Sequence, residues 1–251
     1  MDITFLGTGT STGVPEIGCQ CPVCTSSDPR DRRLRTSVLV GVEGKNILLD
    51  CGPDFRWQMI RNGVRQLDAV LISHEHYDHV GGLDDLRPFC RKKNIDLYTE
   101  ANVVEAIHTR LPYVFRINPY PGVPKIELHT VTTEPFEAAG IKILPIRVMH
   151  GKLPILGFRI GKMAYITDVK YLPEEEYDKL KDLDVLIITA LRHEPHPTHQ
   201  SISEALENIK RIQPRNAYLI HMGHSAGLHA EIEKQLPAHV HFSYDGLKLT
   251  I

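Results

Sequence analysis

Short apolar runs, separated by polar or glycine-rich stretches, recur along this chain of 251 residues. Runs rich in β-branched residues, such as residues 69–72 and 185–188, are typical of buried strands. The same pattern predicts strands at residues 3–6, 37–42, 46–50, 96–99, 126–131, 141–148, 156–160, 164–167 and 217–220, and two short strands close the chain.

Helices are predicted between these strands, where apolar residues recur every three or four positions. Ser201 and Glu204 form a capping box that opens an amphipathic helix over residues 202–212. Further helices are expected at residues 53–62, 101–111, 173–181 and 228–236, and another is expected to begin at residue 81. Because no linker or composition break interrupts the series, residues 1–251 are predicted to form a single α/β domain.

The composition indicates a globular protein, because 42% of the residues are apolar and 24% are charged. The net charge of −2 offers no general electrostatic footprint for nucleic acid, which is therefore not an expected partner. No apolar run approaches the roughly 20 residues that cross a bilayer, and the first residues do not resemble a signal peptide. We therefore expect a cytoplasmic protein that does not interact with membranes.

Three histidines and an aspartate directly follow the strand at residues 69–72. They are His74, His76, Asp78 and His79. Alternate positions let His74 and His76 point toward one ion, while Asp78 and His79 turn toward a second ion nearby. Imidazole nitrogen and carboxylate oxygen suit zinc, manganese or iron better than calcium or magnesium. The alternative is a histidine-rich surface loop without metal.

Three more residues that can bind metal stand where predicted strands end, namely His150, Asp168 and His221. A single histidine beside a strand is usually structural, but sheet proteins gather functional groups at one edge, so the shared position favours a common site. Asp50 also ends a strand, and we expect it either to orient a histidine ligand or to accept backbone hydrogen bonds. The four prolines in residues 112–124 predict an irregular loop, for which we consider the role of a lid.

A second candidate metal site lies near the start of the chain. Cys19, Cys21 and Cys24 have the Cys-x-Cys-x-x-Cys spacing that supplies three of the four tetrahedral ligands of zinc. The fourth ligand must come from elsewhere in the chain. Reduced surface cysteines are the alternative, and five cysteines with three clustered do not suggest a disulfide framework.

The run His-x-His-x-Asp-His at residues 74–79 resembles the signature of the metallo-β-lactamase superfamily. That resemblance implies a four-layer αββα sandwich with two divalent ions, zinc or manganese, in its active site. It implies that His74, His76 and His150 bind one ion, that Asp78, His79 and His221 bind the other, and that Asp168 bridges both. Two ions held in this way generate a hydroxide that attacks a phosphoryl or carbonyl centre.

The cysteine cluster, the spacing of His221 and His224, and a histidine before a late helix together resemble a narrower family. This is the phosphoribosyl 1,2-cyclic phosphate phosphodiesterase family of carbon–phosphorus bond breakdown. The resemblance implies a structural zinc held by Cys19, Cys21, Cys24 and His224, and it implies a homodimer.

By the same resemblance His199 is a general acid, and His199 and Asp78 are the predicted catalytic residues. His199 also stands just before a capped helix N-terminus, which favours phosphate oxygens. An imidazole protonated near pH 7 would protonate a leaving alkoxide. The alternative is a solvent-exposed histidine beside the helix. The predicted substrate is a small phosphodiester, either a cyclic phosphate or a nucleotide.

The chain departs from that family at residues 191–198, where extra histidines precede His199. Arg192 is predicted either to clamp a phosphate or to form an exposed salt bridge, and His193 and His196 have no assigned role. Two other functions share the same metal ligands: hydrolysis of a lactone or thioester, and a non-hydrolytic metalloprotein of cofactor biosynthesis.

Overall fold

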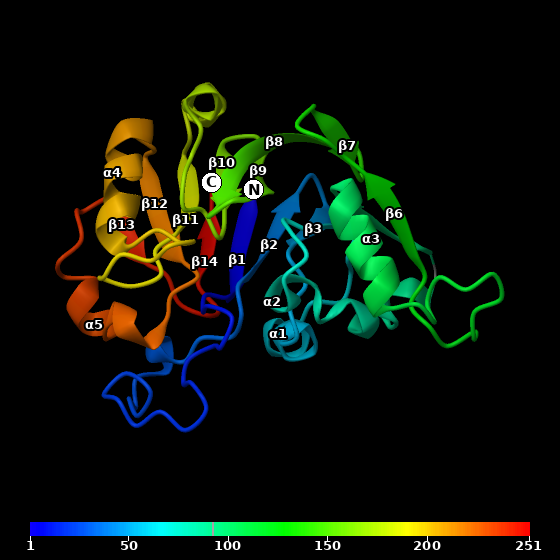
Figure 1. Ribbon diagram of the computed structural model, residues 1–251, viewed down its shortest axis with the longest axis horizontal. Coiled ribbons are helices and arrows are strands. Elements are labelled where there is room, and N and C mark those ends of the chain that lie inside the picture. The colour runs from blue at the N-terminus through cyan, green and yellow to red at the C-terminus, as the bar shows by residue number, and fades with distance from the viewer. Residues whose placement is uncertain (92) are drawn as a thin grey trace.

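A computed structural model describes residues 1–91 and 93–251, and within this part of the chain two seven-stranded sheets pack face to face (Figure 1). The first sheet has the strand order β14-β1-β2-β3-β4-β5-β6. Its strands are β1 (Asp2–Gly7), β2 (Ser37–Val42), β3 (Lys45–Leu49), β4 (Ala69–Leu71), β5 (Ile95–Thr99), β6 (Ile126–Thr130) and β14 (Lys248–Thr250).

The second sheet has the strand order β13-β12-β11-β10-β9-β8-β7. Its strands are β7 (Phe136–Ala138), β8 (Ile141–His150), β9 (Leu153–Ile160), β10 (Met163–Ile166), β11 (Val185–Thr189), β12 (Asn216–Ile220) and β13 (Val240–Phe242). Each sheet is antiparallel in one half and parallel in the other.

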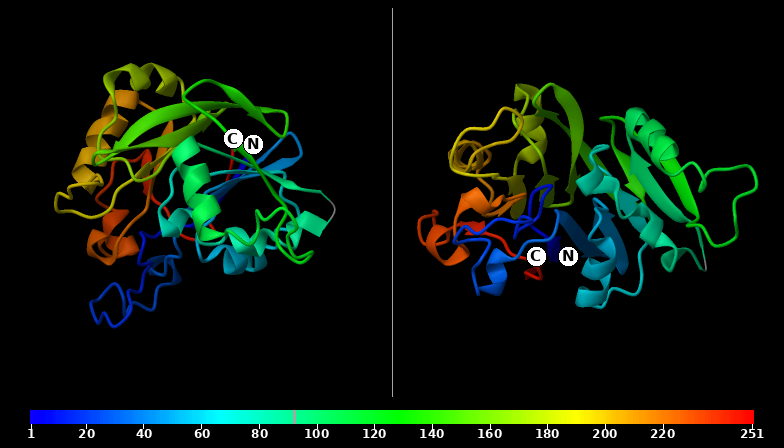
Figure 2. Two further views of the ribbon diagram at one scale, coloured as in Figure 1. Left: turned by 45° about the vertical axis from the view of Figure 1, so that its right-hand side comes forward. Right: turned by 60° about the horizontal axis from the view of Figure 1, so that its bottom comes forward.

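Helices cover the outer faces of both sheets, which makes four layers (Figure 2). The helices α1 (Phe55–Asn62) and α3 (Ala101–Arg110) pack on the first sheet, and α4 (Ile202–Ile212) and α5 (His229–Ile232) pack on the second. A single-turn helix, α2 (Tyr77–Val80), follows β4. The predicted αββα sandwich is therefore confirmed.

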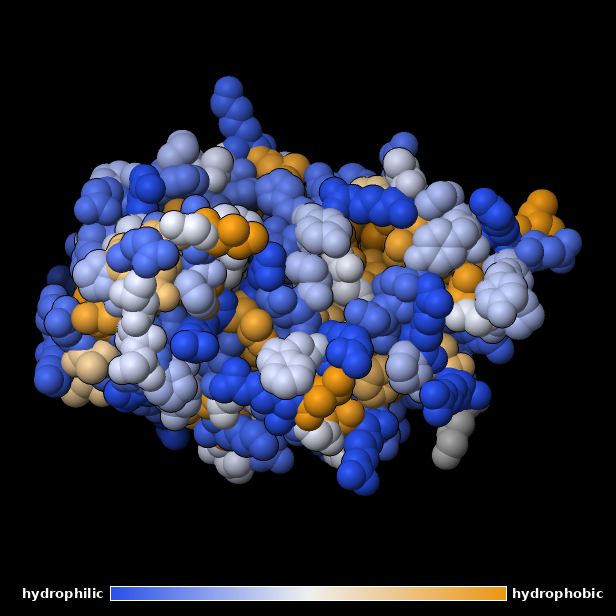
Figure 3. Space-filling model, turned by 90° about the horizontal axis from the view of Figure 1, so that it is seen from below, coloured by the Kyte–Doolittle hydropathy of each residue, from blue (hydrophilic) through white to orange (hydrophobic). Residues whose placement is uncertain are grey.

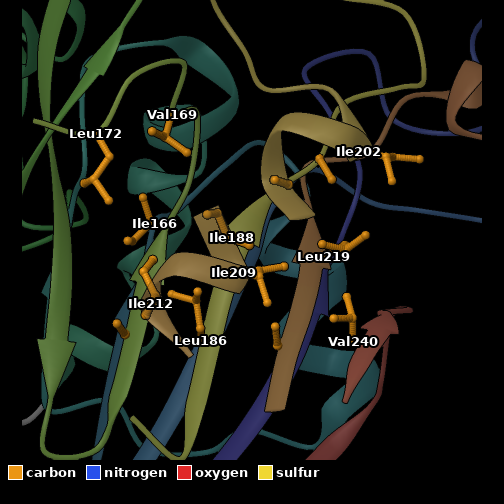
Figure 4. Close-up of a cluster of buried hydrophobic side chains, with 14 of the residues drawn as sticks. Ile166, Val169, Leu172, Leu186, Ile188, Ile202, Ile209, Ile212, Leu219 and Val240 are labelled. Carbon is orange, nitrogen blue, oxygen red and sulfur yellow. The ribbon is translucent and has the colours of Figure 1, made fainter. Parts of the chain in front are cut away.

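Strand β11 shows why its sequence is continuously apolar. Ile187 faces the core between the two sheets, whereas Leu186 and Ile188 face α4 on the other side. Because both faces of the strand are buried, every position needs an apolar side chain. Figure 4 shows this outer core, in which Ile202 and Ile209 of α4 lie over the sheet.

Strand direction brings distant segments to one edge of the sandwich. Strand β8 is antiparallel to β9, and β9 is antiparallel to β10, so β8 and β10 run the same way. Strands β11 and β12 are parallel to β10. In the first sheet β3 and β4 are parallel to each other. The carboxyl ends of the ligand-bearing strands therefore meet at one edge.

Most predicted strands and the helices at residues 53–62, 101–111 and 202–212 are confirmed within about two residues, including the Ser201–Glu204 capping box. Residues 83–86 and 174–180 form 3₁₀ helices where α-helices were expected. The sequence did not distinguish the two, because an apolar pattern over so few residues does not separate three from 3.6 residues per turn. Helix α5 ends at Ile232, earlier than expected, and β7 was not predicted.

The proline-containing loop of residues 112–124 lies at the outer end of the molecule beyond β6 (Figures 1 and 2). It does not lie over the ends of β4, β10 and β12, so the prediction of a lid is wrong. Seen from below, the edge that carries α1 and α2 is largely hydrophilic, with hydrophobic side chains in small separate groups (Figure 3). None of the helices in the described residues has both the length and the apolar character needed to cross a membrane.

Candidate metal centre

The first ligand group comes from three strand ends and joins both sheets. His74 and His76 follow β4, His150 ends β8, and Asp168 follows β10. The ligand atoms of these four residues all lie within 4.8 Å of one another. His74 Nε2 lies 2.9 Å from His76 Nδ1 and 3.8 Å from Asp168 Oδ2. The structure therefore brings together the residues predicted to hold one ion.

The second ligand group shares Asp168 with the first. Asp78 and His79 lie in α2, and His221 follows β12. His221 Nε2 lies 3.1 Å from Asp168 Oδ1 and 3.3 Å from Asp78 Oδ2, and His79 Nε2 lies 3.4 and 3.2 Å from the same two oxygens. A tetrahedron with metal–ligand bonds of about 2.0–2.1 Å has edges of about 3.4 Å, so these spacings fit one ion.

The carboxylate of Asp168 faces both groups, with Oδ2 toward His74 and Oδ1 toward His79 and His221. It is the only residue that belongs to both groups among those described. This is the arrangement of a bridging ligand.

The chemistry of the ligands also fits a cation. His79 Nε2 is buried and has no hydrogen-bond partner among the described residues, although two carboxylate oxygens face it. Burial would lower the pKa of His79, but Asp78, Asp168 and Asp50 raise it well above its ordinary value. The imidazoles in turn hold the pKa of Asp78 and Asp168 below the ordinary value, against the effect of burial. Ionised carboxylates concentrated in so small a space favour divalent cations.

Asp50 accepts hydrogen bonds from three residues at the centre of the site. His79 Nδ1 lies 2.9 Å from Oδ2, Tyr165 Oη donates to the same oxygen at 2.7 Å, and the Ser73 N–H donates to Oδ1 at 2.8 Å. Ser73 Oγ also contacts Asp50, and it lies 3.0 Å from His74 Nδ1. The prediction that Asp50 orients a histidine is confirmed at His79, and through Ser73 it reaches His74 as well.

His150 is oriented by the loop that precedes α4. Its Nδ1 lies 2.9 Å from the carbonyl oxygen of Thr198, which leaves Nε2 for an ion. The next residue, Gly151, has φ +62°, and a Cβ there would lie 2.9 Å from Thr198 Cγ2. A glycine is therefore required both for the turn after β8 and for the close approach of this loop.

Three residues of the site adopt the left-handed backbone conformation although none is glycine. Their φ angles are +61° at Asp50, +53° at Asp168 and +60° at His221. Each residue stands just beyond a strand, and the turn redirects its side chain toward the space between the sheets. Such conformations are costly in most residues and concentrate at functional sites.

The cysteine cluster closes around a histidine from the other end of the chain. His224 Nδ1 lies 3.2, 3.5 and 3.4 Å from the sulfur atoms of Cys19, Cys21 and Cys24. Tetrahedral zinc with bonds of about 2.3 Å to sulfur and about 2.0 Å to nitrogen separates such ligands by about 3.5 Å. The four residues predicted to hold the structural zinc are therefore together.

The thiols of Cys21 and Cys24 have pKa values shifted in opposite directions. The backbone N–H of Cys24 lowers the pKa of Cys21 to about 7, whereas burial raises the pKa of Cys24 to about 11. A cation would be needed to keep the sulfur atom of Cys24 ionised at neutral pH, which fits zinc.

His199 stands between the two ligand groups of the dinuclear site. Its ring centroid lies 4.6 Å from that of His150 and 4.9 Å from that of His221. Its Nδ1 is buried without a hydrogen-bond partner among the described residues and lies 3.8 Å from Asp168 Oδ2. Burial, with His221 acting in the same direction, lowers the pKa of His199 to about 3. In the chain without metal, these surroundings favour the neutral ring over the protonated one.

The loop that leads to His199 is held by its own arginine. Arg192 donates to the carbonyl oxygens of Glu194 at 3.2 Å and Pro195 at 2.9 Å, and it forms no salt bridge among the described residues. His193 is exposed, whereas His196 is half-buried with its ring centroid 5.1 Å from that of His199. Sequence patterns gave no signal for the roles of Ser73, Tyr165 and Thr198, because these act across elements distant in the chain.

A further group, Asp96, Glu127 and His129, lies on the neighbouring strands β5 and β6. His129 Nε2 is 2.8 Å from Asp96 Oδ1, and all three residues are at least partly exposed. A surface hydrogen bond accounts for this group without an ion.

Comparison with known proteins agrees with this geometry. Residues 45–222 match the Beta-lactamase superfamily domain. The chain is similar to a solved diphosphatase from the PhnP family, with 40% identity, a TM-score of 0.93 and coverage of 99% of this chain and 96% of that one. It also superimposes on Zn²⁺-bound PqqB from Methylobacterium extorquens with a TM-score of 0.80, but at 19% identity this likeness shows the fold alone.

A curated relative from Porphyromonas gingivalis, called an octanoyltransferase, is 50% identical over 254 residues. The match covers all of this chain but 52% of that protein. This chain thus spans about half, or less, of the length of the curated relatives it matches first.

The substitution Asp50→Asn tests the orientation of His79. It removes the negative charge behind the ring, and loss of such a partner typically weakens metal binding by about 10–100-fold. Metal titration followed by elemental analysis should show weaker binding at one of the two sites. Tyr165→Phe is the matched control, because it removes one donor and keeps the carboxylate. Equal metal affinity in Asp50→Asn and the unmodified chain would contradict this role.

The substitution Cys21→Ser tests the cysteine cluster. Zinc content should fall by about one equivalent and the melting temperature should drop, because structural zinc contributes directly to folding. Cys90→Ala provides the control, since Cys90 is buried outside every ligand group and should leave zinc content unchanged. Zinc content that does not change in Cys21→Ser would show that the cluster holds no ion.

Proposed function

The chain belongs to the beta-lactamase superfamily and, within it, to the PhnP family, and we propose that it is a dinuclear metal-dependent hydrolase that cleaves phosphoester bonds in small molecules. The observation that carries this proposal is the pair of ligand groups that share Asp168. Together they contain seven imidazole or carboxylate ligands at the meeting edge of the two sheets. When bound, two such ions supply Lewis acidity and a hydroxide nucleophile at neutral pH.

The protein's own residues would arrange this chemistry. Asp168 fixes the separation of the two ligand groups, since its two oxygens serve one group each. Asp50 and the Thr198 carbonyl hold His79 and His150 through the ring nitrogen that does not face the ligand group. Prepositioned ligands need no reorganisation as charge develops on the phosphoryl group, which lowers the barrier.

His199 is the residue we propose to act on the leaving oxygen. The position of His199 supports this role, because its ring contacts one histidine of each ligand group and its buried Nδ1 has no hydrogen-bond partner among the described residues. A neutral imidazole can donate a hydrogen bond there through its N–H. Transfer of a full proton requires the ring to be protonated first, and negative charge from a bound phosphate acts in that direction.

The substrate we propose is a small phosphodiester, a cyclic phosphate or nucleotide, or the related phosphoanhydride of a diphosphate. The diphosphatase of the PhnP family supports the last of these, since it matches nearly the whole chain. Thioester or lactone hydrolysis is the second candidate, because a 50% identical relative bears the name octanoyltransferase. That relative is about twice as long, so its name can describe the half that this chain does not match.

A panel of substrates separates these functions. Protein loaded with zinc or manganese is assayed on bis(p-nitrophenyl) phosphate, 2′,3′-cyclic AMP, ADP-ribose, an octanoyl thioester and a lactone. We expect turnover on at least one phosphorus substrate that is lost on chelation and recovered when metal returns. Turnover on the thioester or lactone alone would favour the second candidate. Turnover on none would favour a non-hydrolytic metalloprotein.

The substitution His199→Ala should lower turnover by about 10²-fold or more on 2′,3′-cyclic AMP, whose alkoxide is a poor leaving group. The loss should be much smaller on bis(p-nitrophenyl) phosphate, because p-nitrophenolate departs without needing a proton. Metal content should stay unchanged in the variant. Equal losses on both substrates would argue against action on the leaving oxygen.

A further inference from the structure

The loop of residues 191–199 is held rigidly against the metal-ligand groups. The Thr198 carbonyl oxygen accepts a hydrogen bond from His150 at 2.9 Å. The Leu191 N–H donates to the Gln200 carbonyl oxygen, and the Leu191 carbonyl oxygen accepts from the Gly223 N–H. Arg192 ties down the two carbonyl oxygens between these anchors. A side chain presented by this loop therefore keeps a defined position relative to the site.

His196 is presented in one tautomer by its hydrogen bonds. The backbone N–H of Thr198 donates to His196 Nδ1 at 3.3 Å, and the Thr198 hydroxyl lies 3.2 Å from the same nitrogen. A nitrogen that accepts from a backbone N–H carries no proton of its own, so the proton of a neutral ring resides on Nε2. That Nε2 makes no hydrogen bond within the described residues, and the ring is half-buried.

The rings form a row that leads outward from the ligand groups. His199 contacts His150 and His221, which are ligands, and His196 contacts His199 at a centroid distance of 5.1 Å. Among the described residues His196 has no other aromatic contact. It thus stands one ring further from the two ligand groups than His199 does.

We propose that His196 binds the leaving group of the substrate by donating its Nε2–H to an oxygen of that group. This rests on the proposed function of the same site. The acceptor is an oxygen of a second phosphate or of a sugar, because both groups carry oxygen atoms that accept a hydrogen bond. His196 would therefore select substrates with oxygen-rich leaving groups over those with apolar ones.

Two substitutions separate this role from support of the loop. His196→Asn places an amide at the position of Nδ1, so it keeps an acceptor for Thr198 and removes the outer donor. His196→Gln places an amide near the position of Nε2, so it keeps a donor for the substrate and removes the acceptor for the Thr198 N–H. The same two changes at exposed His193 are the controls and should have no effect.

We expect His196→Asn to lower kcat/KM by about tenfold on 2′,3′-cyclic AMP or on ADP-ribose, mainly through KM, which is the effect of about one neutral hydrogen bond. A lower kcat/KM on 2′,3′-cyclic AMP identifies a sugar oxygen as the acceptor, and a lower kcat/KM on ADP-ribose identifies a phosphate oxygen. Activity on bis(p-nitrophenyl) phosphate should stay near that of the unmodified chain. His196→Gln should retain most of the activity, and metal content should not change in either variant.

Three results would overturn this proposal while the unmodified enzyme remains active. They are equal losses on all three substrates, a larger loss in His196→Gln than in His196→Asn, and loss of metal from His196→Asn. Inactivity of the unmodified enzyme on every phosphorus substrate would instead reject the proposed function.

Discussion

The buried carboxylate of Asp50 is the contact on which the site depends. It lies at the end of β3 in the first sheet, and it accepts a hydrogen bond from Tyr165 of β10 in the second. The same group holds His79 and, through Ser73, His74. A buried carboxylate that receives no hydrogen bonds would strongly destabilise the fold. The donors that satisfy this carboxylate come from Tyr165, Ser73 and His79, so the same hydrogen bonds join the sheets and orient the ligands. The layers cannot shift against each other without disturbing the ligand geometry.

Around this contact, strand direction brings most of the candidate ligands to one edge of the fold. Strands β8, β10 and β12 run the same way, and a candidate metal ligand lies at or just after the carboxyl end of each. These ends lie at the edge where His74 follows β4. The left-handed turns at Asp168 and His221 then direct the side chains inward. The stable hydrogen-bonded sheets behind these turns compensate for their backbone strain.

The candidate ligands could be predicted from sequence, because few residue types bind such ions, their spacing after strands is distinctive, and the family resemblance groups them into sites. The structure brings all seven dinuclear ligands and the cluster of Cys19, Cys21, Cys24 and His224 together as expected. The supporting contacts could not be predicted, because Tyr165, Thr198 and Arg192 act on partners that only the tertiary fold brings near. The burial of His199 among other imidazoles, which lowers its pKa, could not be predicted for the same reason, since it is a tertiary property.

The four residues from His221 to His224 complete both candidate metal sites at once. His221 belongs to the dinuclear groups, and His224 joins cysteines that are made some two hundred residues earlier. As the ribosome synthesises the chain from its amino end, neither site can close until this segment has emerged. A nascent chain therefore carries its first histidines and thiols in incomplete sets until residues 221–224 have been made, and neither site can hold its ion before that point.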